Sequence, residues 1–159
     1  GLEEMLVGSN TEKVVRNSDI PVLVIKEDTE NFKVENIVFA SNFKMKNQPA
    51  FQDILNFATL FNAKIHLLKI NTIHNFETTE VSSEAIKNFI EGSDLGDFSL
   101  NIYNDITIED GILNFTKLID ADIIILNTHN RRGLAHLFNG SIGKDLTNHA
   151  KLPVVTFKL

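Results

Sequence analysis

Gly140 and Ser141 open a segment of helical period shortly after the apolar run Asp122–Leu126. The first backbone N–H groups of a helix lack partners within the helix, so a helix start of this kind suits an anion such as phosphate. The serine hydroxyl can add one hydrogen bond. Alternatively, Ser141 only caps the helix and Gly140 only makes the turn, which is the commoner use of such a pair. The residues alone leave both interpretations open.

Other reactive side chains do not form a recognised catalytic or metal-binding pattern. Gly143 and Lys144 are followed by Asp145, where a P-loop needs serine or threonine. The five histidines lack metal-ligand spacing, and the absence of cysteine excludes thiolate zinc sites and disulfides. With no Ser/His/Asp set and no paired carboxylates, the sequence predicts neither catalysis nor a metal centre.

Short β-branched runs alternate with longer segments of helical period. The runs that predict strands are Val34–Ala40, Lys64–Ile70, Phe98–Tyr103, Asp122–Leu126 and Pro153–Phe157. The segments that predict helices are Gln48–Phe61, Ser82–Ile90, Ile106–Ile119 and Ser141–Ala150, with a loop at Asn71–Val81 and a turn at Gly92–Asp97. This alternation predicts an α/β fold, with an open five-stranded parallel sheet sandwiched by helices.

Ligands of open α/β sheets bind beyond the carboxyl ends of the strands, near the point where the strand order reverses. Three segments follow strands in this way and carry polar residues. They are Ser41–Asn42, Ile70–Asn71 and Asn127–Gly140. We therefore expect any ligand site to be built from these segments.

The chain contains a repeat of domain size. Gly1–Ile25 aligns without a gap on Gly133–Phe157 at an offset of 132, with Gly8/Gly140, Ser9/Ser141 and Pro21/Pro153 among the identical pairs. We interpret residues 1–26 as the last helix and strand of a preceding repeat, 27–33 as a linker and 34–159 as a complete domain. A start in mid-repeat predicts that the natural N-terminus lies upstream.

The segments NIVFASNF, KIHLLKI and ADIIILNTHNRRGLAHLFNGS resemble the universal stress protein family, over essentially all of Val34–Leu159. The resemblance implies a Rossmann-like, adenine nucleotide alpha hydrolase-like fold. A nucleotide-binding subclass of that family carries a Gly-x-x-Gly-x9-Gly-Ser/Thr signature and an aspartate just after the first strand. The corresponding positions here, together with Ile70 after the second strand, give these candidate nucleotide-binding residues: Asn42, Ile70, Asn127, Asn130, Gly140 and Ser141.

Three asparagines stand where that subclass has two glycines and an aspartate. Asparagine tolerates left-handed backbone angles, but its side chain occupies space that a phosphate needs. Asn42 offers an amide that can also donate, where a carboxylate only accepts. We expect a degenerate site with no cofactor, in a non-catalytic stress-response module. The alternatives are an ATP-binding switch, with or without slow hydrolysis, and, with less support, an unrelated flavodoxin-like enzyme.

Composition and charge bear on partners. Fifteen Lys+Arg against 21 Asp+Glu give a net charge of −6 without basic runs, which disfavours nucleic acid as a partner. No apolar run is long enough to span a membrane and no signal peptide opens the chain, so we expect a cytoplasmic protein.

The resemblance implies antiparallel pairing of last strands, here Val22–Ile25 with Val154–Phe157. The apolar stripe of helix Ser9–Ser18 predicts a homo-oligomer.

Overall fold

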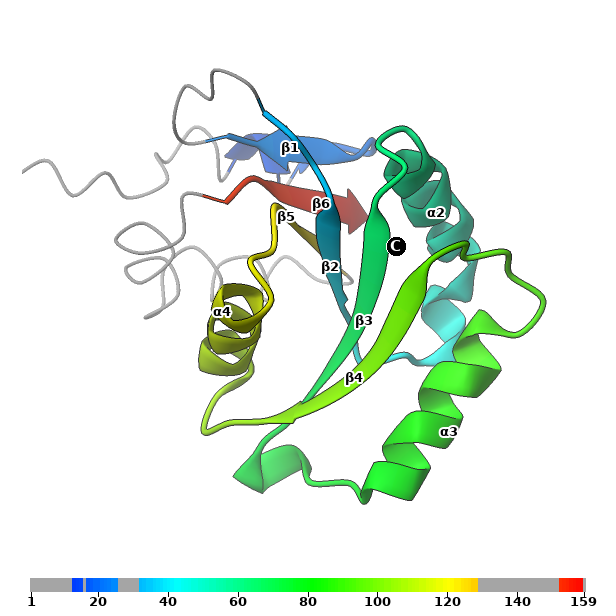
Figure 1. Cartoon of the computed structure of the whole chain (residues 1–159), viewed down its shortest axis with the longest axis vertical. Helices are drawn as coiled ribbons and strands as arrows, with labels where there is room; N and C mark the ends of the chain where they lie inside the picture. Colours follow the sequence, from blue (N-terminus) through cyan, green and yellow to red (C-terminus); the bar gives the residue numbers. More distant parts are fainter. Residues whose placement is uncertain (1–12, 16, 26–31, 129–151, 159) are drawn as a thin grey trace, which may run out of the picture.

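The computed structural model describes residues 13–15, 17–25, 32–128 and 152–158. Within these ranges one sheet has the strand order β1-β6-β5-β2-β3-β4 (Figure 1). The strands are β1 (Val22–Val24), β2 (Asn36–Ala40), β3 (Lys64–Asn71), β4 (Phe98–Asn104), β5 (Ile123–Thr128) and β6 (Val154–Lys158). β2 to β6 are parallel and β1 is antiparallel to β6. The predicted α/β fold with its parallel sheet is confirmed.

Helices cover both faces of the sheet. α2 (Phe51–Thr59) and α3 (Thr79–Ile90) pack on one face, and α4 (Ile108–Leu118) packs on the other (Figure 1). Each helix turns an apolar stripe inward, and in α2 the buried residues are Phe51, Ile54, Leu55 and Ala58. β5 is buried along Ile123–Leu126, because its side chains enter the apolar clusters on both faces of the sheet. The unbroken apolar run of this strand predicted such burial.

The strand order reverses between β2 and β5. From β2 the chain builds outward through β3 to β4, and then returns to add β5 and β6 on the other side of β2. Asp122 fixes the junction at the amino ends of the two strands. Its carboxylate accepts the backbone N–H groups of Glu35 and Asn36, at 2.8 and 2.9 Å. The carboxyl ends of β2 and β5 therefore lie side by side, where a ligand crevice is expected.

The helix predicted at Gln48–Phe61 is two elements. A 3-10 helix, η1 (Met45–Ala50), contains Pro49, and the α-helix starts at Phe51. Proline has no N–H and clashes with the carbonyl four residues earlier, so it does not fit inside a continuous α-helix. The predicted helix therefore started too early and extended past Thr59.

The prediction of a loop over Asn71–Val81 was wrong at both ends. Asn71 is the last residue of β3, a short 3-10 helix η2 spans Ile73–Asn75, and α3 begins at Thr79. The Thr78 hydroxyl accepts the Val81 N–H at 3.3 Å and so acts as the N-cap. Thr107 caps α4 in the same way, through the Asp110 N–H at 3.0 Å.

A buried histidine links three strands on the α4 face. His66 of β3 contacts the Asn36 carboxamide oxygen through Nε2 at 3.0 Å and the Ser99 hydroxyl through Nδ1 at 2.8 Å. Asn101 donates to the same hydroxyl at 2.9 Å. Burial lowers the pKa of His66, because the charged imidazolium loses hydration there. The network supplies polar partners inside an otherwise apolar layer.

The N-terminal segment adds a strand to the sheet. β1 and β6 form the expected antiparallel ladder within one chain, in the register Val22↔Thr156, Leu23↔Val155 and Val24↔Val154. Within the helix predicted at Ser9–Ser18, residues 13–15 and 17 are helical and Val15 is buried. Ser18 is described but is not helical, and residues 9–12 and 16 lie outside the described residues. Among the residues that the structure describes, none belongs to a helix long and apolar enough to cross a membrane.

Candidate functional site

A side chain of β5 meets a side chain of the loop after β2, where the strand order reverses. Asn127 of β5 donates through Nδ2 to the Ser41 hydroxyl, which follows β2, at 3.1 Å. The same hydroxyl oxygen accepts the Phe43 N–H at 3.1 Å. Two of the segments that the sequence proposed for a ligand site are thus brought together, and a side-chain hydrogen bond joins them.

The loop after β2 is held in an unusual conformation. Phe43 has a φ of 53°, in the left-handed region that a residue with a Cβ rarely adopts. Its ring is buried and packs edge-on against Phe39 and Phe89, with centroids 5.7 and 5.4 Å apart. This packing compensates for a backbone conformation that is otherwise unfavourable. The aromatic core therefore sets where Ser41 and Asn42 lie.

Asn42 turns its side-chain oxygen toward its own loop. Oδ1 accepts the backbone N–H of Lys44 and the Nδ2 group of Asn47, both at 3.2 Å. An oxygen occupied in this way stabilises the turn into η1. The residue is exposed, and its carbonyl oxygen already serves the loop.

The other predicted site residues are placed differently. Ile70 packs against the apolar cluster under α4, on the face opposite to Asn127. A Cβ added at Gly111 of α4 would come within 2.8 Å of Ile70 Cγ2, so this helix and strand are in close contact. The structure does not bring Ile70 to the asparagines. Asn130, Gly140 and Ser141 lie outside the described residues, and their role stays a prediction.

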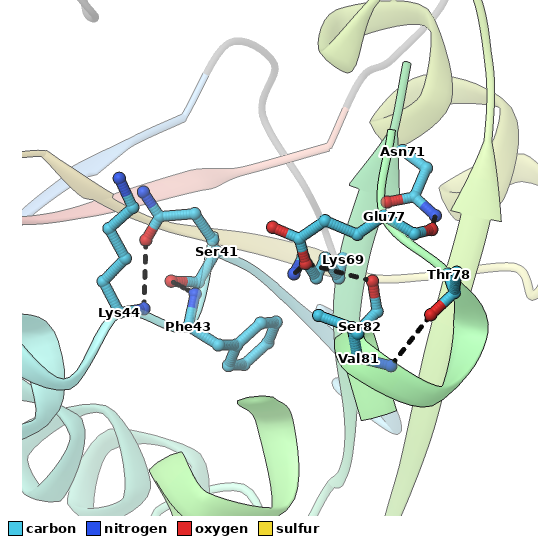
Figure 2. Close-up of polar contacts among 10 residues, drawn as sticks. Ser41, Phe43, Lys44, Lys69, Asn71, Glu77, Thr78, Val81 and Ser82 are labelled. Carbon is cyan, nitrogen blue, oxygen red and sulfur yellow. Dashed lines mark hydrogen bonds and ion pairs between the residues drawn. The ribbon is translucent and has the colours of Figure 1, made fainter. Parts of the chain in front are cut away.

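A charged pair at the end of β3 was missed by the sequence analysis. Lys69, only 7% exposed, forms an ion pair with Glu77, which precedes α3 (Figure 2). The hydrogen bond from Lys69 holds the pKa of Glu77 below its usual value. The available signal was a lysine inside the apolar run HLLKI, because a buried lysine needs a partner.

The described part of this edge offers amide, hydroxyl and ammonium groups rather than a catalytic constellation. Within the same described ranges, no group of three or more His, Asp or Glu residues could hold a metal ion. Hydroxyl, amide and ammonium groups all donate hydrogen bonds, so the arrangement can bind and orient a polar ligand.

Solved structures with the same fold are universal stress proteins. One from Archaeoglobus fulgidus is 18% identical with a TM-score of 0.70, covering 98% of this chain and 56% of its own. A universal stress protein in complex with cAMP is 12% identical with a TM-score of 0.57, covering 80% and 97%. UspA from Lactobacillus plantarum is 18% identical with a TM-score of 0.54, covering 80% and 99%. At these identities the likeness shows a shared fold.

The sequence itself matches a family model in its C-terminal third. Residues 105–158, which include α4, β5 and β6, match the universal stress protein family. No curated protein matches the chain. The chain spans just over half the length of the Archaeoglobus fulgidus protein. It is therefore universal stress protein-like in its fold and, over residues 105–158, in its sequence.

Proposed function

We propose that this universal stress protein-like chain is a non-catalytic regulatory module of the stress response, with a degenerate nucleotide site at the β2/β5 crevice. The observation that supports this most is the hydrogen bond from Asn127 to Ser41, because it pairs these two side chains with each other rather than with a ligand. Asn42 supports it as well, since its side-chain oxygen already accepts two hydrogen bonds within its own loop. The cytoplasmic location expected from the sequence stays a prediction.

The alternative is an ATP-binding switch of the same fold. Its support is that a universal stress protein of this fold was solved in complex with cAMP, so an adenine nucleotide is a reasonable ligand to test. Gly140 and Ser141, which have the residue types of the family signature, also favour it. The feature that distinguishes the two proposals is the presence of asparagine at positions 42, 127 and 130, and it favours the first proposal.

We expect Mg-ATP to bind weakly or not at all. Asn127 and Asn130 place side chains where glycines would let the backbone approach the phosphates. In the chain as it stands, a ligand in the crevice also has to displace the Asn127–Ser41 hydrogen bond. Isothermal titration calorimetry measures the affinity directly, and a micromolar dissociation constant would overturn the proposal.

Variants separate the causes of that weakness. Asn127→Gly with Asn130→Gly should recover binding, because it removes both side chains and frees Ser41. Asn42→Asp alone should do little, since a carboxylate oxygen can keep the loop hydrogen bonds that the amide oxygen accepts now. If Asn42→Asp restores affinity by itself, crowding is not the defect and the missing carboxylate is.

We also propose that the chain is part of a tandem arrangement and that it associates with other copies. The repeat at an offset of 132 and the pairing of β1 with β6 support the first point. Apolar side chains left exposed on the N-terminal segment support the second. They are Val14, Ile20, Leu23 and Ile25, at 57, 73, 43 and 53% exposure.

Light scattering tests the association. We expect the mass of a dimer or a higher oligomer, and we expect Leu23→Lys with Ile25→Lys to shift the distribution toward monomer, because the two charges would be buried in the interface. Leu60→Lys serves as the matched control, since Leu60 follows α2, is 78% exposed and does not belong to the N-terminal segment. A native chain that stays monomeric at high concentration would contradict the proposal.

A further inference from the structure

A buried ammonium group lies at the carboxyl end of β3. Lys69 is flanked along the strand by Leu68 and Ile70, and its side chain is 9% exposed. A charge in such a place requires a counter-charge, because it has lost most of its hydration. Glu77 supplies that counter-charge from outside the strand.

Several positive features converge on one carboxylate oxygen. Glu77 Oε2 accepts hydrogen bonds from Lys69 Nζ and, at 3.4 Å, from the fully buried Ser82 hydroxyl (Figure 2). Glu77 directly precedes Thr78, the N-cap of the twelve-residue helix α3, so its carboxylate also lies at the positive end of a helix. These are the surroundings of a bound oxyanion.

The carboxylate that fills this position is the exchangeable member of the group. The Glu77 side chain is 44% exposed and belongs to the connection between η2 and α3, whereas Lys69 and Ser82 are buried in a strand and a helix. Glu77 can therefore swing into solvent while its partners cannot. The charge of Lys44, which also favours ionised Glu77, would remain nearby.

Asn71 supplies a second, independent observation. Its Nδ2 group donates to the Glu77 carbonyl oxygen at 3.0 Å, which places the amide beside the same group. Its Oδ1 atom is buried and has no hydrogen-bond partner among the residues that the structure describes. A buried acceptor without a donor is unfavourable, so the site would gain from a ligand that brings a hydroxyl.

We propose that Lys69, Ser82 and the start of α3 form a binding subsite for a small phosphate group, which Glu77 occupies as an internal, displaceable ligand. A phosphate that retains one proton matches the whole set. Its anionic oxygens would replace the Glu77 carboxylate at Lys69 and Ser82, and its P–O–H group would donate to Asn71 Oδ1. The subsite lies at the end of β3, next to the Asn127–Ser41 pair, because the Ser41 N–H donates to the carbonyl of Leu68, the residue before Lys69.

The experiment uses the full chain, with inorganic phosphate as the probe and binding followed by NMR near pH 6. Glu77→Gln keeps the shape but removes the competing charge, and should bind phosphate at least about tenfold more tightly than the native chain. Glu80→Gln is the matched control, because Glu80 is exposed in the first turn of the same helix. It should leave the native affinity unchanged. Adding Lys69→Met to Glu77→Gln should abolish the gain.

Two further probes define the ligand. Sulfate has the size of phosphate but is a dianion without a proton at this pH, whereas phosphate keeps at least one P–O–H group. Sulfate should therefore bind Glu77→Gln several-fold more weakly, despite its higher charge, if Asn71 Oδ1 accepts a hydroxyl. Glycerol 3-phosphate should bind as well as inorganic phosphate if monoesters are the natural ligands, and more weakly if the free ion is. Sulfate binding equal to phosphate would remove Asn71 from the proposal.

Equal phosphate affinity in Glu77→Gln and Glu80→Gln would overturn the subsite. If Glu77→Gln fails to fold by circular dichroism, the native chain provides the test. Phosphate should then raise its melting temperature above that in chloride of equal ionic strength, and Lys69→Met should lose that rise. A rise that persists in Lys69→Met would overturn the proposal. These variants change Glu77 and Lys69 and leave Asn42, Asn127 and Asn130 as they are, so the outcome can be told apart from that of the nucleotide titrations.

Discussion

Replacing Phe89 by alanine is expected to lower the free energy of unfolding by about 3–5 kcal/mol. Phe89 is fully buried in α3, and its ring contacts those of Phe39, Phe43 and Phe51, with centroids 6.4, 5.4 and 5.1 Å apart. The substitution removes the apolar contacts and leaves a cavity between two helices and the sheet. Urea denaturation followed by circular dichroism measures the change.

The same substitution should also loosen the loop after β2. Packing of the Phe43 ring stabilises its left-handed backbone, and Phe89 is one of its two aromatic neighbours. Phe76→Ala provides the matched control, since that ring is 72% exposed and its removal should change stability by no more than about 0.5 kcal/mol. Equal losses in the two variants would show that the aromatic cluster is not the centre of the core.

Removing residues 1–25 is expected to make the chain associate through a new surface, the edge of β6 that β1 covers in the native chain. Without β1, the edge of β6 would present unpaired backbone groups between the buried residues Val154, Val155 and Phe157. An apolar edge of this kind pairs readily with another copy of itself. Light scattering should give at least twice the mass of the Leu23→Lys, Ile25→Lys variant at the same concentration.

Two controls belong to that experiment. A chain that lacks only residues 1–12 retains β1 and should behave as the native chain does. A synthetic peptide that spans Ile20–Ile25 should reverse the association of the longer truncation if edge pairing is its cause. A truncated chain that stays monomeric would show that β6 does not need β1 as its cover.

The strands could be predicted from the sequence because their signal is local. Runs such as Ile123–Leu126 are apolar throughout and mostly β-branched, and the structure places them where they were expected. Helix ends were less predictable, since the periodicity of apolar residues does not show that Pro49 lacks an N–H or that the Thr78 hydroxyl caps a helix.

The contacts of the site could be predicted only in part. That Ser41 and Asn127 lie near each other followed from the rule on strand order, but not that one donates to the other. The pair Lys69–Glu77 was missed because Glu77 lies in a stretch that the sequence analysis treated as a featureless loop. Ile70 was chosen by its position after a strand, and the alternation of side chains places it on the other face.

The pairing of β2 with β5 also constrains how the chain folds. Val38 and Ile124 are partners in this ladder although most of the domain separates them in sequence. During synthesis, β2, β3 and β4 can assemble first, while the other edge of β2 stays open until β5 emerges. Closing so long a loop is slow, since its entropic cost is met before the contacts form. We therefore expect an early intermediate with an exposed edge at Asn36–Ala40, the segment most in need of protection on the ribosome.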